Sequence, residues 1–273
     1  MTAAVPPDHR VVSVAARGGR LEVSCRYRPG VGEALVYFHG LGSTSGDFLG
    51  AWNVPEWSNH ALLAFDAPAC GATRGYRAGL PLGVDDIVRV AEALVAELRL
   101  DGLTVIGHSL GGLAGLLFAS RHQASVRRFV NVEGNLGPED CALYSRRVFQ
   151  ERFLGREDAF MTALAEELRA STEPGLPEVA SSLRRNVEDA AFFDYCRSIV
   201  AYSDGYPLMD TFVALRMPRI YVHGAEPAPP YVADLIGRGV SCAAVPASGH
   251  FPVASNPARY YAALVDFMHE TAS

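Results

Sequence analysis

Short apolar runs and helical patterns alternate along most of this chain, and the alternation constrains its fold more than any other feature. The runs at 34–39 and 61–66 are continuous and apolar, as buried parallel strands are. Apolar positions recur at helical spacing over 84–100. Strands that alternate with helices indicate an α/β fold with a mostly parallel, twisted sheet flanked by helices. Further strands are predicted at 103–107, 128–132, 219–223 and 240–245, further helices at 113–122, 230–237 and 257–270, and an antiparallel hairpin at 10–16 and 21–27.

The alternation stops for about 80 residues in the middle of the chain. This block shows helical patterns and no clear strand, with helices predicted at 139–153, 157–170 and 176–202. Compact domains seldom contain so long a connection unless it forms a unit of its own. We therefore expect a core made of residues 1–134 and 216–273, with a helical lid, residues 135–215, inserted after the sixth strand.

The basic residues narrow the chemistry. All 24 are arginine, so the chain offers no lysine for a Schiff base, for pyridoxal phosphate or for a P-loop. The net charge of −6 and the absence of a long basic run speak against a nucleic-acid partner. Such an arginine bias is typical of a G+C-rich genome and suggests a bacterial source.

The cysteines and the N-terminus suggest a compartment. Five cysteines are far apart and form no CxxC pair, which favours a reducing environment and argues against a disulfide framework or a zinc site. The first ten residues lack the charged and apolar regions of a signal peptide, and no apolar run is long enough to cross a membrane. We expect a soluble, cytoplasmic protein that binds no metal and no membrane.

The segment 107–112, Gly-His-Ser-Leu-Gly-Gly, matches the G-x-S-x-G nucleophile elbow. A predicted strand precedes Ser109 and a predicted helix follows it, which is the context that this motif requires. The flanking glycines leave room for a tight strand-to-helix turn. Ser109 is therefore the candidate nucleophile.

With this motif the sequence resembles the α/β-hydrolase superfamily, and the resemblance covers nearly the whole chain. His-Gly-Leu-Gly at 39–42 looks like the family's turn after the third strand, and Gly-His-Phe-Pro at 249–252 looks like the turn that carries its catalytic histidine. Phe-Asp-Ala-Pro-Ala-Cys-Gly at 65–71 is similar to the family's FDxPGxG loop, from which Cys70 departs. The resemblance implies a lid-bearing serine hydrolase that needs no cofactor.

The resemblance also implies the roles of several residues. His250 would be the general base, because the family supplies its base from that turn. The backbone N–H groups of Leu41 and Leu110 would form the oxyanion hole. His39 is expected to shape the loop that carries Leu41.

The acid is where this sequence departs from the commonest family pattern. That pattern has an aspartate after the strand that follows the lid, and here the position holds Pro227. Two carboxylates could replace it. Glu133, at the end of the strand before the lid, is the favoured candidate, because an unpaired charge there would be costly. Glu226 is the alternative, one residue before the usual site, and a third reading has neither of the two as the acid.

Large apolar side chains in the lid suggest an apolar substrate pocket, although most of them must also pack the lid on the core. The pocket residues proposed from the sequence are His39, Trp52, Phe149 and Phe153. The predicted function is cleavage of an ester or thioester of a small-to-medium apolar substrate through an acyl-enzyme on Ser109. The same groups would serve an acyltransferase, a lyase, a C–C hydrolase or a cyclising enzyme, and a non-catalytic protein that binds a small ligand is the third alternative.

Overall fold

The computed structural model describes residues 8–76, 79–153 and 155–272. Residues 1–7, at the start of the expected core and within the N-terminus analysed for a signal peptide, lie outside the described residues. Eight strands form one sheet: β1 (Asp8–Ala16), β2 (Gly19–Arg28), β3 (Ala34–Phe38), β4 (Ala61–Phe65), β5 (Leu103–His108), β6 (Val126–Val132), β7 (Arg219–Gly224) and β8 (Ser241–Val245). Their order across the sheet is β1-β2-β4-β3-β5-β6-β7-β8.

Strands β3 to β8 pair in parallel, and the β1–β2 hairpin joins the sheet antiparallel to β4. The central strands β3, β4 and β5 are buried along their whole length, as their continuous apolar runs predict. The predicted mostly parallel sheet is confirmed, and its expected strand boundaries lie within two residues of the observed ones.

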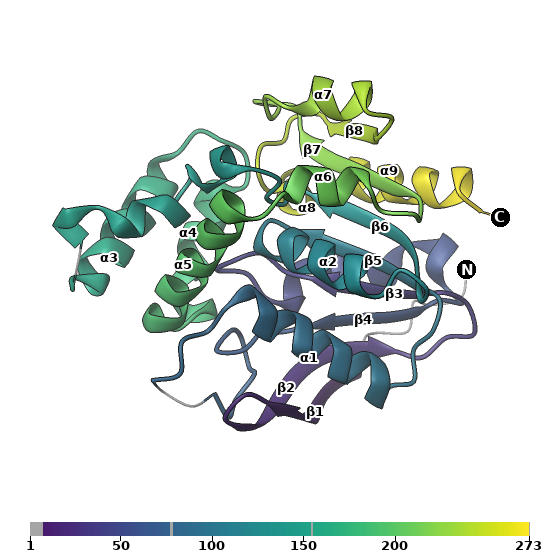
Figure 1. Cartoon of the computed structure of the whole chain (residues 1–273), viewed down its shortest axis with the longest axis horizontal. Helices are drawn as coiled ribbons and strands as arrows, with labels where there is room; N and C mark the ends of the chain where they lie inside the picture. The colour runs from purple at the N-terminus through teal and green to yellow at the C-terminus, as the bar shows by residue number, and fades with distance from the viewer. Residues whose placement is uncertain (1–7, 77–78, 154, 273) are drawn as a thin grey trace.

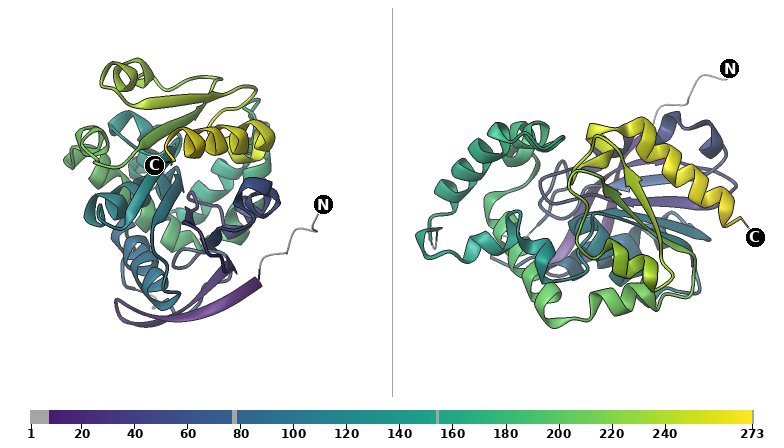
Figure 2. Two further views of the ribbon diagram at one scale, coloured as in Figure 1. Left: turned by 90° about the vertical axis from the view of Figure 1, so that its right-hand side faces the viewer. Right: turned by 90° about the horizontal axis from the view of Figure 1, so that it is seen from above.

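Helices cover both faces of the sheet (Figures 1 and 2). One face carries α1 (Val84–Glu97), α2 (Leu110–Arg121) and the short α6 (Leu208–Val213); the other carries the 3₁₀ turns η1 (Ser45–Asn53) and η2 (Pro55–Trp57) and the C-terminal helix α9 (Pro257–Glu270). The apolar core divides accordingly into two clusters, one on each side of the sheet. The short helices α7 (Val232–Gly237) and α8 (Pro252–Ser255) flank β8.

The connection between β6 and β7 is helical, and most of it lies beyond the end of the sheet (Figure 1). It contains the 3₁₀ turns η3 (Pro138–Cys141), η4 (Ser145–Phe149) and η5 (Glu151–Phe153), followed by α3 (Glu157–Ala170), α4 (Leu176–Asn186), α5 (Asp189–Gly205) and α6. Helix α6 packs on the sheet, since the ring of Phe212 meets Phe129 of β6 edge-on at 5.8 Å. We call residues 135–205 the helical cap.

Two helix predictions in this region are wrong. The predicted helix at 139–153 is a series of 3₁₀ turns, because Tyr144 leaves the helical region (φ −152°) and directs its hydroxyl to the carbonyl oxygen of Leu41, 3.3 Å away. The predicted helix at 176–202 is two helices. The chain is extended at Val187, where it forms a β-bridge with Cys70, so a tertiary contact overrides the local helical pattern.

Candidate active site

Ser109 lies on the sharp turn between β5 and α2. Its backbone angles, φ 53° and ψ −120°, fall in a region that residues other than glycine seldom adopt. A Cβ atom at Gly107 would collide with the backbone of Gly111, and one at Gly111 with the carbonyl oxygen of Phe38. The glycines of the motif are therefore required by the packing of this turn. Helix α2 begins directly after Ser109 and not at the predicted residue 113, so Gly111 and Gly112 lie in its first turn, where a Cβ atom would collide with Phe38 and Asn131 respectively.

The structure brings Ser109, His250 and Glu133 together. Nε2 of His250 lies 3.0 Å from Oγ of Ser109, and Nδ1 of the same ring lies 3.5 Å from Oε2 of Glu133. The second contact is an ion-pair distance, longer than a well-formed hydrogen bond. The side chains of His250 and Glu133 are 21% and 10% exposed, so water screens this pair only in part. One imidazole thus stands between a hydroxyl and a carboxylate.

Glu133 is fixed by the sheet itself. It adopts a left-handed conformation (φ 49°) directly after β6, and its N–H donates to the carbonyl oxygen of Val222 in β7 (3.0 Å). Its Oε1 accepts a hydrogen bond from the N–H of Gly224 (2.8 Å). Both bonds tie the end of β6 to β7 and aim Oε2 at His250. The structure keeps Glu226 apart from this group: its Oε1 accepts from the N–H of Ala247 at 3.3 Å in an exposed loop.

His108, the residue before Ser109, contacts the loop that carries His250. Its Nε2 lies 2.7 Å from the carbonyl oxygen of His250. Burial, with the neighbouring His250 ring, lowers the pKa of His108 to about 3, so the ring is neutral and its Nε2–H donates this bond. On the opposite side, the backbone N–H of His250 donates to Oε1 of Glu173 (2.8 Å), a residue of the helical cap.

The loop after β3 lies against Ser109. A Cβ atom at Gly40 would stand 3.3 Å from Cβ of Ser109 and 2.8 Å from Nδ1 of His108. Among the described residues, none accepts a hydrogen bond from the backbone N–H of Leu41 or of Leu110. His39 lies within this loop, where its Nε2 accepts from the N–H of Ala67 (2.9 Å) and its Nδ1–H donates to the carbonyl oxygen of Gly40 (2.7 Å).

A cavity of about 680 Å³ opens beside His250 and Glu133. Seven charged side chains line it, against three apolar residues. The charged residues are Glu133, Glu139, Asp140, Arg147, Arg152, Glu167 and Glu173; the apolar ones are Ala142, Leu143 and Pro227.

Several of these charges are already engaged. Arg147 binds both carboxylate oxygens of Glu167 (3.0 and 2.7 Å). Asp140 accepts from the N–H groups of Leu136 and Gly137 and from the hydroxyl of Tyr231, while its burial raises its pKa.

Arg152, the other arginine that lines the cavity, has different partners from Arg147. Its Nε donates to the side chain of Gln150 (3.1 Å), and its guanidinium lies 4.6 Å from the ring centre of Phe153. None of the side chains that the structure describes is a carboxylate partner of Arg152.

The apolar pocket expected from the sequence is not what the structure shows. Trp52 is buried in the apolar cluster with Trp57 and Tyr261, on the α9 side of the sheet, and does not line this cavity. Phe149 is 49% exposed, and Phe153 packs edge-on against Phe160 inside the helical cap. His39 is also absent from the lining of the cavity. The reason is packing, since the rings of Phe153, Phe160, Phe192 and Phe193 contact one another and form the interior of the cap.

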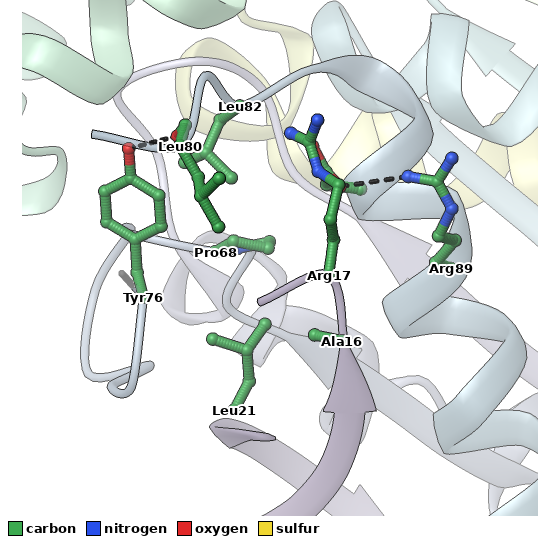
Figure 3. A pocket seen from close by; sticks show the side chains of 9 residues that line it. Ala16, Arg17, Leu21, Pro68, Tyr76, Leu80, Leu82 and Arg89 are labelled. Atoms are coloured by element: carbon green, nitrogen blue, oxygen red, sulfur yellow. Dashed lines mark hydrogen bonds and ion pairs between the residues drawn. The ribbon is translucent and has the colours of Figure 1, made fainter. Parts of the chain in front are cut away.

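A second cavity, of about 20 Å³, lies between the β1–β2 hairpin and the loop before α1 (Figure 3). Arg17 and Arg89 both bind the carboxylate of Asp86 at its rim. This cavity is large enough for about one water molecule and is therefore too small for a substrate. Among the described residues no cluster of histidine, cysteine, aspartate or glutamate is placed to hold a metal ion, and no helix is long and apolar enough to cross a membrane.

Comparison with known proteins identifies the family. The model of the alpha/beta hydrolase family matches residues 35–263. The chain belongs to this family. The resemblance seen in the sequence is thus confirmed, and with it the α/β-hydrolase fold.

Individual relatives of this alpha/beta hydrolase are distant. A 2-hydroxy-6-oxo-2,4-heptadienoate hydrolase of Pseudomonas putida is 29% identical over 175 residues, 56% of this chain and 61% of that protein. An AB hydrolase superfamily protein of Gibberella zeae is 33% identical over 101 residues, 37% of this chain and 34% of that protein. The matches therefore span less than two thirds of the length of these curated relatives. A solved esterase of Thermogutta terrifontis superposes with a TM-score of 0.72 over 97% of this chain and all of that one, at 15% identity, which shows the shared fold.

Sequence reasoning missed the contacts that the helical cap makes with the site. Glu173, Tyr144 and Asn186 reach the backbone of His250, Leu41 and Gly42 respectively. These bonds join side chains to backbone groups far away in the sequence, and no motif marks them. The glycine of Glu173-Pro174-Gly175 is the one local signal, since it indicates a turn between two helices.

Proposed function

We propose that this alpha/beta hydrolase is a serine hydrolase that cleaves an ester or thioester of a small-to-medium substrate through an acyl-enzyme on Ser109. One observation carries the proposal: a single imidazole, that of His250, contacts the Ser109 hydroxyl at 3.0 Å with one nitrogen and the Glu133 carboxylate at 3.5 Å with the other. A serine needs such a base to become a nucleophile, and the base needs such a carboxylate to hold its tautomer.

The proposed mechanism uses only these groups. Nε2 of His250 accepts the Ser109 proton while Oγ attacks the carbonyl carbon, and Glu133 stabilises the imidazolium. The backbone N–H groups of Leu41 and Leu110 bind the oxyanion. The imidazolium then protonates the leaving group, and a water molecule activated by His250 hydrolyses the acyl-enzyme. No step requires a cofactor.

The cavity beside His250 is the proposed substrate site, and its volume lies within the range of small-molecule sites. Its charged lining supports a substrate that carries polar groups rather than the apolar substrate expected from the sequence. The helical cap would act as the lid over this site, as the sequence suggested for residues 135–215. The five free cysteines support the cytoplasm as the proposed compartment.

A second candidate function is hydrolysis of a C–C bond in a substrate that bears a carboxylate. Arg152 favours it, because this cation lines the cavity and pairs with no carboxylate among the side chains that the structure describes. The Pseudomonas putida relative, whose name denotes a dienoate substrate, supports it as well.

The proposal is tested by treating the protein with a small fluorophosphonate and measuring its intact mass. We expect one adduct on the wild-type protein and none on Ser109→Ala, with both proteins folded by circular dichroism. Absence of the adduct from folded wild-type protein would contradict the proposal. Turnover of a 2-hydroxy-6-oxo-dienoate well above that of matched esters and thioesters would place the C–C hydrolase first.

A further inference from the structure

Within the described residues, the helical cap makes one hydrogen bond to the backbone of His250, the proposed base. Glu173 lies in the turn between α3 and α4, and its Oε1 accepts the backbone N–H of His250 at 2.8 Å. This carboxylate comes from a segment separate from the sheet that supplies Ser109 and Glu133. It also lines the cavity beside His250.

Two glycines make room for the contact, one on each side. A Cβ atom at Gly249 would collide with the carboxylate of Glu173, and one at Gly175 would stand 2.7 Å from Cβ of Phe251. Gly175 adopts a left-handed conformation (φ 94°) that a glycine accommodates without strain. The turn 173–175 and the loop 249–251 are therefore fitted to each other.

The position of Glu173 is itself determined locally. Its backbone N–H donates to Oγ of Ser171 (3.1 Å), and its carbonyl oxygen accepts the N–H of Leu176 at the start of α4 (3.3 Å). The carboxylate therefore moves with the cap. Within the described residues, the backbone of His250 is held by this bond on the N–H side and by His108 on the carbonyl side.

From this arrangement we propose that Glu173 is a positioning residue for His250, and that docking of the cap holds the imidazole within reach of Ser109. The proposal rests on the proposed serine hydrolase function. Without the bond, the loop 249–251 loses its tie to the cap, and the Nε2–Oγ distance of 3.0 Å is no longer fixed from that side. A displacement of about 1 Å at a reacting group costs up to about a hundredfold in rate.

The test measures the kinetics of fluorophosphonate labelling and separates the maximal rate constant, kinact, from the half-saturating concentration, KI. We expect Glu173→Ala to lower kinact about ten- to hundredfold with KI unchanged. Glu173→Gln keeps an amide oxygen as acceptor and should stay within about threefold of wild type. Glu178→Ala, which removes an exposed carboxylate from the first turn of α4, is the matched control and should label at the wild-type rate.

Each outcome decides between the ideas. A kinact for Glu173→Ala within twofold of wild type, or a loss in Glu173→Gln as large as in Glu173→Ala, would overturn the proposal. If Glu173→Ala does not fold, Glu173→Asp replaces it, because the side chain is one methylene shorter, falls short of the N–H and should be slow as well. Failure of the wild-type protein to label at all would instead refute the serine hydrolase function.

Discussion

Glu133→Gln tests the proposed acid with the least change in shape. The glutamine keeps an oxygen that can accept the N–H of Gly224, so the link between β6 and β7 remains, while the charge facing His250 is lost. The charge acts mainly in the transition state, because only then is the imidazole protonated. The variant therefore removes transition-state stabilisation and leaves the folded structure nearly unchanged.

The size of the effect follows from the geometry. For unit charges 3.5 Å apart, Coulomb's law with an effective dielectric constant of about 20 gives about 5 kcal/mol. That energy corresponds to a decrease in rate of about 10³- to 10⁴-fold. A dielectric constant of about 20, well below that of water, is appropriate for this pair because both side chains are largely shielded from water.

The assay is kcat/KM on a p-nitrophenyl ester, with urea unfolding to show that stability is retained. Glu226→Gln is the matched control, because among the described residues the Glu226 side chain accepts a hydrogen bond only from the N–H of Ala247. We expect it to retain wild-type activity. A loss of less than tenfold in Glu133→Gln, or an equal loss in Glu226→Gln, would refute the assignment of Glu133.

Two further predictions concern stability. Ser109→Gly should abolish activity. Its free energy of unfolding should nevertheless be about 1 kcal/mol higher than that of Ser109→Ala, because glycine relieves the backbone strain at φ 53° and ψ −120°. Urea unfolding of the two variants measures this difference, and a glycine variant less stable than the alanine variant would contradict the prediction. The free energy of unfolding should also fall as the pH drops below 6.5. In the native state, burial and the adjacent His250 ring lower the pKa of His108 to about 3, so the ring stays neutral. In the unfolded state the same ring binds a proton below about pH 6.5, which favours unfolding. Between pH 6.5 and pH 5 the loss from this group is about 2 kcal/mol, and His108→Gln should show a correspondingly smaller loss in urea unfolding at the two pH values.

The sheet could be predicted from the sequence because its strands are short, apolar and separated by helical patterns. The run at 34–39 and the strand at 34–38 differ by a single residue, since a buried parallel strand leaves a continuous apolar signal. The turn at Ser109 was predictable because close backbone contacts require its glycines, that of Gly107 with Gly111 and that of Gly111 with Phe38. The placement of Glu133 at the end of β6, and its contact with His250, agree with the favoured reading of the sequence.

The helical cap was predicted less well. Its aromatic residues suggested a pocket, but their periodicity alone cannot say whether a ring faces a substrate or another ring. Phe153 faces Phe160, and Phe149 faces outward. The break between α4 and α5 depends on the bridge from Val187 to Cys70, a contact between residues more than a hundred positions apart. Such contacts leave no local pattern.

The position of Glu133 also bears on the evolution of the loop that follows β7. Strands β5 and β6 are neighbours, so one β–α–β unit carries both the serine and the carboxylate, and only the imidazole comes from elsewhere. In the commonest family pattern the loop after β7 must hold an acid, and here it holds none that contacts His250 within the described residues. Under the proposed assignment of Glu133 as the acid, residues 225–230 need not supply one, so the length and charge of this segment beside Pro227 can vary in evolution without loss of the proposed triad.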